Sequence, residues 1–323
     1  MKKLTLALSA IVAAFSASAQ ADVSVSGSTG AAYVSNMASS NNTDLIVGSS
    51  VNFALSTTTS NGLGISAAMG ISLDPDANGQ TVTSSVPSGV TGGNSVTFTT
   101  GGATIVVGDI EIADTPGSVG GVVGGIVGDN SGAAGAPTTG FIDDDGAGLS
   151  LSTAVGSASL KIGYIVNDNA DNHAIINSST SGADSLTAAS ISVPMGAYTV
   201  SLGMANSDAS EDASGASVAA ALGGGTLTVG YSQQTLATRS GLAVAGDTTV
   251  VGGTYSMAMD ADTTVKVGYK NWKDADSQSA TQMDASISRS LGGGASVYLD
   301  IRNLAGDATT NGTAIGIGTS VSF

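Results

Sequence analysis

The sequence predicts an all-β protein, a transmembrane antiparallel β-barrel of about sixteen strands. Three observations lead to this fold class. Apolar residues recur at every second position in one segment after another, tight glycine-rich turns alternate with long polar connections, and the first 21 residues have the features of a secretory signal peptide. The composition agrees, since 41% of the 323 residues are hydrophobic, only 11% are charged and 46 are glycine.

The N-terminal segment has the three parts of a signal peptide. Lys2 and Lys3 form a positively charged start, an apolar stretch runs from Leu4 to Phe15, and Ala19-Gln20-Ala21 is a small-residue cleavage site. We therefore expect residues 1–21 to be removed and residues 22–323 to form the barrel. A buried helix of a cytoplasmic protein is the alternative interpretation. No later stretch reaches the roughly 20 consecutive apolar residues of a membrane-spanning helix.

Composition excludes several classes of function. Nine Lys and Arg oppose 25 Asp and Glu, and two of the nine cations lie in the signal peptide, so the surface is too acidic for a nucleic-acid partner. The absence of cysteine excludes a disulfide framework and thiolate chemistry. The single histidine, His173, lies in a polar stretch, which argues against a lipid-hydrolysing Ser/His pair on the outer wall. We expect no enzymatic activity.

The strands are placed by alternation. Around Val47, Val51 and Leu55, apolar residues alternate with polar or small ones, which indicates a strand with one apolar face. Sixteen such segments are expected, at residues 23–34, 45–57, 63–73, 95–100, 103–110, 147–154, 158–166, 186–193, 197–205, 217–222, 226–232, 248–257, 262–271, 281–291, 294–303 and 313–323.

The connections between these segments alternate in length. Short turns are expected at residues 61–62, 101–102, 156, 194–196, 223–225, 260–261 and 292–294, and long loops at 35–44, 74–94, 111–146, 167–185, 206–216, 233–247, 272–280 and 304–312. This alternation places all turns at one end of the barrel and all long loops at the other, which is typical of outer-membrane barrels. With about sixteen strands the interior is wide enough for an aqueous channel.

Alternation also assigns aromatic side chains to a face. The repeated triplets ending at Tyr164, Tyr231 and Tyr269 place a tyrosine on the outward face near the long-loop end. Together with Trp272, we expect these tyrosines to contribute to an aromatic girdle at the membrane interface. Core tyrosines of a β-sandwich are the alternative interpretation.

Charged residues within strands are expected to face the lumen, because a charge on the lipid face at mid-membrane costs roughly 2–4 kcal/mol. The lumen-facing charges predicted in this way are Lys161, Lys266, Lys270, Asp300 and Arg302. Arg289 is an exception, since it shares a face with Met283 and Ile287. Because it lies near the turn at Gly292, its side chain could extend to the interface.

Taken together, these features resemble the general porins of Gram-negative bacteria, in particular the alphaproteobacterial type. The resemblance rests on the start at Asp22–Gly27, the sixteen segments, the outsized third loop at 111–146 and a final strand that closes on Phe323. It implies a homotrimer of water-filled barrels in the outer membrane, in contact with lipid and lipopolysaccharide, with no cofactor. It also implies that the third loop folds into the lumen and that barrel-assembly machinery recognises the strand ending at Phe323.

In such porins the third loop supplies carboxylates to the channel constriction. The matching residues are Asp109, Glu111, Asp114, Asp129, Asp143, Asp144 and Asp145. A solvated surface loop is the alternative. The sequence departs from the family pattern because residues 22–160 contain eleven Asp or Glu and no Lys or Arg, so the basic wall that usually opposes the loop is absent there. We therefore expect a cation-preferring channel for small hydrophilic solutes and ions. Ca²⁺ could bind the acidic residues at 143–145 or 168–171, although neither has EF-hand spacing.

A secreted structural or adhesive β-protein, of the solenoid or surface-layer type, is the alternative function. Such proteins share the enrichment in Gly, Ala, Ser, Thr and Asp. Solenoids show a fixed repeat period, whereas the segments here have irregular spacing.

Overall fold

The structure is a computed structural model of the 323-residue chain. It describes residues 22–36, 42–73, 90–91, 95–111, 145–166, 185–207, 212–236, 246–273, 278–307 and 311–323. Within these ranges all regular secondary structure is β-strand, and no described segment is a helix long and apolar enough to cross a membrane. The predicted signal peptide lies outside the described residues.

The described residues form seventeen strands. They are β1 (Asp22–Asn36), β2 (Asn42–Thr58), β3 (Gly64–Leu73), β4 (Val90–Thr91), β5 (Val96–Thr100), β6 (Ala103–Glu111), β7 (Asp145–Val155), β8 (Ala158–Val166), β9 (Ser185–Met195), β10 (Tyr198–Ser207), β11 (Asp212–Leu222), β12 (Gly225–Leu236), β13 (Gly246–Ala258), β14 (Thr263–Lys273), β15 (Ser279–Gly292), β16 (Ala295–Gly306) and β17 (Gly312–Ser322).

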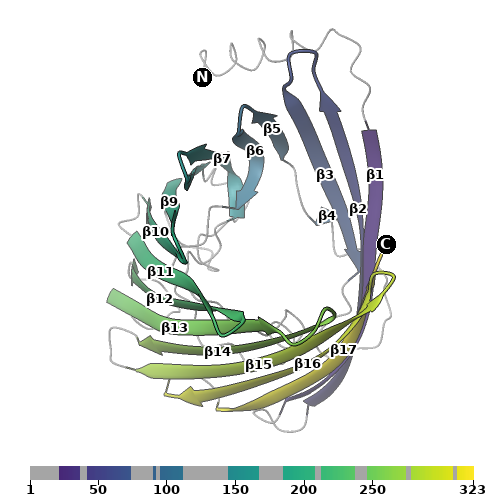
Figure 1. Ribbon diagram of the computed structural model, residues 1–323, viewed down its shortest axis with the longest axis vertical. Coiled ribbons are helices and arrows are strands. Elements are labelled where there is room, and N and C mark those ends of the chain that lie inside the picture. The colour runs from purple at the N-terminus through teal and green to yellow at the C-terminus, as the bar shows by residue number, and fades with distance from the viewer. Residues whose placement is uncertain are drawn as a thin grey trace.

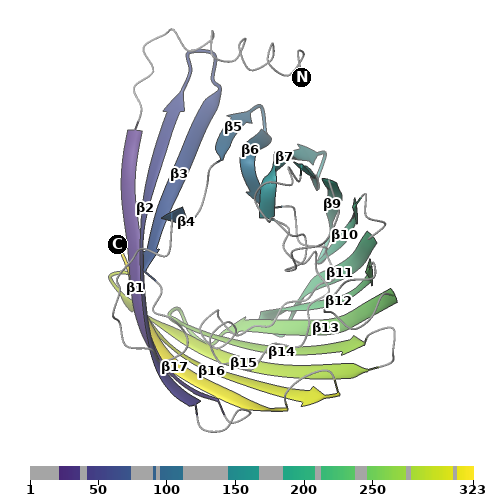
Figure 2. The ribbon, with the colours of Figure 1, turned by 180° about the vertical axis from the view of Figure 1, so that it is seen from behind.

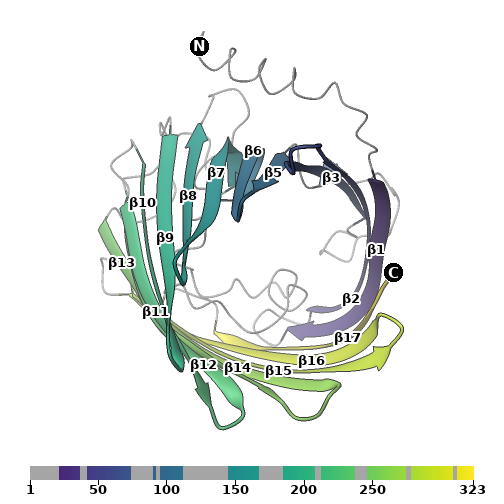
Figure 3. The ribbon, with the colours of Figure 1, turned by 45° about the horizontal axis from the view of Figure 1, so that its top comes forward.

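Sixteen of these strands close into a ring. Each of these sixteen strands pairs antiparallel with the barrel strand before and after it, β3 pairs with β5 as well as with the two-residue β4, and β1 pairs with β17. Figures 1 and 2 show the ring from its two sides, and in Figure 3 the C-terminus lies beside β1. The predicted sixteen-stranded antiparallel barrel is confirmed. The solenoid alternative is wrong, because all described pairings are antiparallel and run between chain neighbours or across the closing seam.

The strands extend further into the predicted loops than alternation indicated. Strand β11 begins at Asp212 and not near residue 217, and Asp212 pairs with both Asn206 and Thr235. The connection between β1 and β2 shrinks to residues 37–41. The reason is that hydropathy marks only the part of a strand that faces lipid, whereas ladder hydrogen bonds continue beyond it where both faces are polar.

The seven short turns follow the predicted positions. Between β15 and β16, Gly292, Gly293 and Gly294 have φ values of +80°, +60° and +78°, a left-handed conformation that only glycine adopts at low cost. The register shifts between Ser290 and Gly292 as the chain enters this turn. The three glycines therefore set the geometry of this hairpin.

The outward face of the ring is apolar, as the alternation predicted. In β8 the side chains of Ile162 and Tyr164 are exposed, whereas the alternate residues Gly163 and Ile165 are buried. Tyr231 and Tyr269 are exposed in the same way. An apolar face that remains exposed on sixteen strands requires a hydrocarbon environment.

Trp272 does not belong to this outward face. It is 9% exposed and packs with Val250, Ala280 and Leu304 on the inner wall. Its assignment to the interfacial girdle is wrong. Trp272 lies three positions beyond Tyr269, and side chains an odd number of positions apart in a strand point to opposite faces.

Two glycines, one at the seam that closes the ring and one on the neighbouring β17, leave room for aromatic rings. The backbones of Gly27 and Phe323 exchange two N–H···O=C bonds of 3.0 Å, and the Phe323 ring lies over Gly27. A methyl group at Gly27 would lie 2.6 Å from Phe323 Cζ and 2.8 Å from the Ser50 carbonyl oxygen. On the inner side, the Tyr298 ring lies over Gly318 in the same manner.

Replacing Gly27 by valine is expected to weaken closure of the barrel. The new side chain cannot coexist with the Phe323 ring and the Ser50 carbonyl, and overpacking of this kind costs roughly 1–3 kcal/mol. The loss can be measured as a shift of the urea midpoint for unfolding from detergent micelles. Gly64→Ala is the control, because a methyl group there lies 3.6 Å from its nearest neighbours. Equal midpoints for Gly27→Val and the wild type would contradict this account of the seam.

Candidate functional site

The inner wall has two zones that differ in exposure. Near the long-loop ends of the strands, inward side chains are buried on most of the ring. The buried set comprises Ala32, Ile110, Ile165, Leu186, Ala188, Ala205, Ala213, Val250, Trp272, Ala280, Leu304 and Ala314. Nearer the turns, inward residues such as Ser152, Thr228 and Ser288 are only half-buried, and Lys266 is exposed. The described residues of the inner wall are therefore more exposed in its turn half.

A polar cluster lies on the inner wall of β14, β15 and β16. Arg302 Nε donates to Asp284 Oδ1 at 3.1 Å, and Gln282 Nε2 donates to Asp284 Oδ2 at 2.6 Å. Asp284 and Arg302 are direct register partners, and Lys270 stands opposite Gln282. All four side chains are buried. The sheet register thus brings together a carboxylate and two cations from three adjacent strands.

Lys266 and Asp300 continue this cluster toward the turns. Both are register partners of Ser286, and Asp300 is buried whereas Lys266 is exposed. The inner wall of β14 to β16 thus carries three cations, at 266, 270 and 302, and two carboxylates, at 284 and 300. Most of the positive charge on this wall is compensated within the wall itself.

Asp284 was not among the predicted site residues. The signal was present, because Asp284 lies between Met283 and Ala285, which share the outward face of β15 with Ile287. Alternation alone therefore places Asp284 inward. Its pairing with Arg302 could not be read from the sequence, because that contact depends on the register between β15 and β16.

The predicted acidic residues fall into two groups. Asp109 and Glu111 end β6, Asp145 begins β7, and Glu111 is the register partner of Asp145. These three residues therefore lie at the long-loop ends of β6 and β7. Asp114, Asp129, Asp143 and Asp144 lie outside the described residues.

The remaining predicted residues are Lys161 and those considered for catalysis or metal binding. Lys161 is half-buried on β8, at the inward alternation. His173 and the acidic stretch at 168–171 lie outside the described residues. Among the residues that the structure does describe, no three His, Cys, Asp or Glu side chains are grouped to hold a metal ion.

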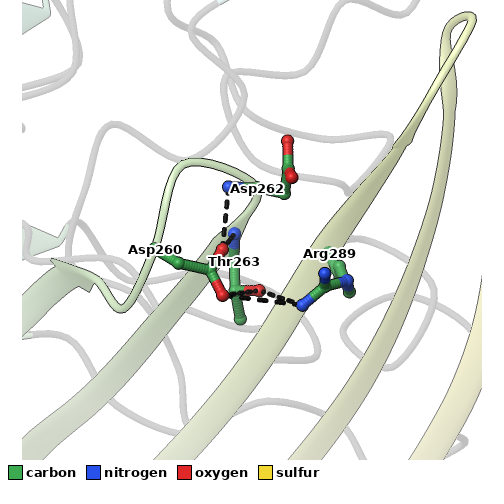
Figure 4. Close-up of polar contacts among 4 residues, drawn as sticks. All are labelled: Asp260, Asp262, Thr263 and Arg289. Carbon is green, nitrogen blue, oxygen red and sulfur yellow. Dashed lines mark hydrogen bonds and ion pairs between the residues drawn. The ribbon is translucent and has the colours of Figure 1, made fainter.

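Arg289 lies at the turn end of the outward face and contacts the turn between β13 and β14 (Figure 4). Arg289 Nη1 donates to Thr263 Oγ1 at 3.0 Å and lies 3.5 Å from Asp260 Oδ2. Thr263 Oγ1 in turn donates to Asp260 Oδ2 at 3.1 Å. The backbone N–H of Asp262 and the Thr263 hydroxyl hold the pKa of the Asp260 carboxyl below its usual 3.8, and Arg289 acts in the same direction.

A closed ring of sixteen antiparallel strands, with an apolar outer face and charged residues on its inner wall, defines a membrane-spanning barrel of the channel-forming class. The sequence profile of the Gram-negative porins matches residues 7–309. The chain belongs to this family, which places it in the outer membrane. No curated protein matches the sequence significantly.

Solved porin structures share the fold at low sequence identity. A porin refined at 1.8 Å resolution superposes with a TM-score of 0.67 at 17% identity, covering 94% of this chain and 100% of that one. A variant of the Rhodobacter blastica porin carrying five substitutions gives 0.64 at 17% identity, with the same coverage of both chains. The anion-selective porin from Comamonas acidovorans gives 0.63 at 16% identity, again with 94% and 100% coverage.

Replacing Asp284 by asparagine is expected to destabilise the barrel by roughly 3–5 kcal/mol, because a buried cation loses its carboxylate. The free energy of unfolding, measured by urea titration in detergent, tests this expectation. Arg289→Gln is the matched control. It breaks an ion pair whose side chains are 54% and 53% exposed, and such pairs contribute about 0–1 kcal/mol. Equal losses for the two variants would show that burial does not govern the strength of the Asp284–Arg302 pair.

The Asp260 turn is expected to make stability depend on acid pH. Because its folded pKa is lowered, ionised Asp260 contributes stability that is present above its ordinary pKa of 3.8 and disappears as the pH falls through the folded value. The difference in unfolding free energy between the wild type and Asp260→Asn should therefore shrink as the pH is lowered from 6 toward about 2. A difference that is constant over this range would mean that ionisation of Asp260 is not the source.

Proposed function

We propose that the protein is a passive diffusion channel of the outer membrane for small hydrophilic solutes and ions, and that it prefers cations. Membership of the porin family and the closed barrel support the channel. The observation that carries the cation preference is the distribution of charge. Residues 22–160 hold eleven carboxylates and no cation, and most of the cationic charge on the inner wall of β14 to β16 is compensated by Asp284 and Asp300.

Uncompensated carboxylates attract cations over a distance of about one Debye length. The Debye length is about 8 Å at physiological ionic strength, so an acidic rim raises the local concentration of cations at the mouth. Glu111 and Asp145 stand eight strands away around the ring from Lys270 and Gln282. In this proposal a cation nears the mouth at an acidic rim on β6 and β7, and the wall of β14 to β16 on the far side of the ring is nearly neutral.

The fold does not fix the sign of this selectivity. The Comamonas acidovorans porin, which shares the fold, is anion-selective. Selectivity in this architecture therefore has to come from the fixed charges that each sequence places along the pore. The excess of 25 acidic over nine basic residues supports a preference for cations.

The proposal includes features that the family resemblance implies. In it, residues 1–21 are cleaved, three copies assemble, and the outer wall contacts lipid and lipopolysaccharide. Assembly machinery recognises the strand that closes on Phe323. The carboxylates Asp114, Asp129, Asp143 and Asp144 of the third loop narrow the pore, whereas Asp109, Glu111 and Asp145 act at its rim.

The selectivity can be tested by reversal potentials in planar bilayers under a potassium chloride gradient. The wild type should give a cation-selective potential. Neutralising the rim with Asp109→Asn, Glu111→Gln and Asp145→Asn together should reduce the preference, because the local cation concentration falls. Lys266→Gln should increase it, because an exposed cation of the inner wall is lost.

A charge-conserving control separates electrostatics from shape. Asp109→Glu, Glu111→Asp and Asp145→Glu together alter the same positions and should leave the reversal potential unchanged. An anion-selective wild type would overturn the proposed cation preference, and the absence of any conductance from folded barrels would overturn the channel itself.

A further inference from the structure

The outward wall carries a charged group where lipid is expected. Arg289 shares its face with Ile287 and Met283 and lies at the turn end of β15. Its guanidinium is fixed by the Thr263 hydroxyl and the Asp260 carboxylate, yet its side chain is 54% exposed. A cation fixed at this height on a lipid-facing wall lies at the level of the headgroups of one leaflet.

The charges around Arg289 have both signs. Its guanidinium contacts Thr263 and Asp260 through the same nitrogen, Nη1, although the group has five N–H donors. Asp260 is 53% exposed beside it, and Asp262 in the same turn is also exposed (Figure 4). A guanidinium binds a phosphate through paired N–H donors, and carboxylates bind a primary ammonium. The pair of charges therefore complements a headgroup that contains both.

An apolar hollow of about 750 Å³ lies on the outward wall over β10 to β14. Its lining includes small residues, among them Ala216 and Gly253, next to larger ones such as Val229, Val251 and Val267. A hollow in a lipid-facing wall is filled by hydrocarbon, since an unfilled space leaves its lining without contact partners.

One column of outward side chains on β14 links the charged group to the hollow. Thr263 contacts Arg289, and Val267, four residues further along, lines the hollow. Four residues of strand span roughly 13 Å. The hydrocarbon depth of one leaflet is about 15 Å, half of a 30 Å core. The spacing therefore matches a lipid whose phosphate lies at Arg289 and whose acyl chain extends into the hollow.

We propose that this wall binds one zwitterionic aminophospholipid from the leaflet at the turn end. Arg289 holds the phosphate, Asp260 and Asp262 hold the ammonium, and an acyl chain occupies the hollow beside Gly253. A purely anionic headgroup is disfavoured by the two carboxylates. A trimethylated ammonium lacks the N–H donors that the carboxylates accept. Free phosphate has no chain to fill the hollow.

Native mass spectrometry of the detergent-purified full chain tests this site. The chain is incubated with equimolar phosphatidylethanolamine, phosphatidylcholine and phosphatidylglycerol of identical acyl composition, and the bound lipid is quantified. We expect phosphatidylethanolamine to exceed each of the others by about tenfold. Arg289→Gln removes the phosphate contact and Ala216→Leu fills the hollow, and each should reduce the phosphatidylethanolamine adduct by about tenfold.

Two matched variants control for nonspecific effects. Lys266→Gln removes a cation from the same strand that carries Thr263, but from its inward face, and Ala189→Leu enlarges an outward residue of β9, which does not line the hollow. Both should bind lipid as the wild type does. Equal binding of the three lipids, a preference for phosphatidylglycerol, or unchanged binding by Arg289→Gln would each overturn the proposal. Lipid binding is measured without conductance, so this outcome and that of the channel test remain separate.

Discussion

The structure depends on one constraint, that every backbone N–H and C=O group within the hydrocarbon must find a partner inside the protein. A sheet meets this requirement only when it has no free edge. Here the pairing of β1 with β17 removes the edge, and the two hydrogen bonds between Gly27 and Phe323 extend the ladder to the last residue. The number of strands, their antiparallel order and the position of the seam all serve this closure.

Closure gives each strand two different environments. The outward face meets hydrocarbon, so Ile162, Tyr164 and their counterparts are apolar although they are exposed. The inward face meets the lumen, so it can hold Lys266 and the buried pair Asp284–Arg302. Glycine is tolerated on both faces because strand pairing, and not side-chain packing across a core, supplies most of the order. At Gly27 and Gly318 the missing side chain leaves space for an aromatic ring.

The charges of the inner wall illustrate how burial and selectivity interact. Asp284 accepts hydrogen bonds from both Arg302 and Gln282. Its carboxylate therefore neutralises part of the positive charge that β16 carries on the inner wall. Under the proposed cation preference, a wall that neutralises its own cations leaves the acidic excess of the remaining chain to set the field in the pore. In the same barrel, Arg289 on the outer face is held by a turn, and its ion pair with Asp260 is about half exposed. The two arginines thus occupy opposite faces of the wall, Arg302 in a buried ion pair and Arg289 in an exposed one.

The elements that depend on local periodicity could be predicted from the amino-acid pattern alone. Alternation located all sixteen barrel strands to within a few residues and identified outward residues such as Tyr231 and Tyr269. The same alternation places Trp272 and Asp284 on the inward face. The polar ends of the strands, such as the start of β11, were not predicted, because they carry no hydropathy signal.

Contacts between residues on different strands became visible only in the folded barrel. Glu111 with Asp145, Asp284 with Arg302, and Gly27 with Phe323 are separated by 34, 18 and 296 positions in the chain and become neighbours through register and closure. A period of two fixes the face of a residue but not its height relative to the next strand. Turn geometry and ring closure fix that height, which is why the faces could be read from the sequence and the contacts could not.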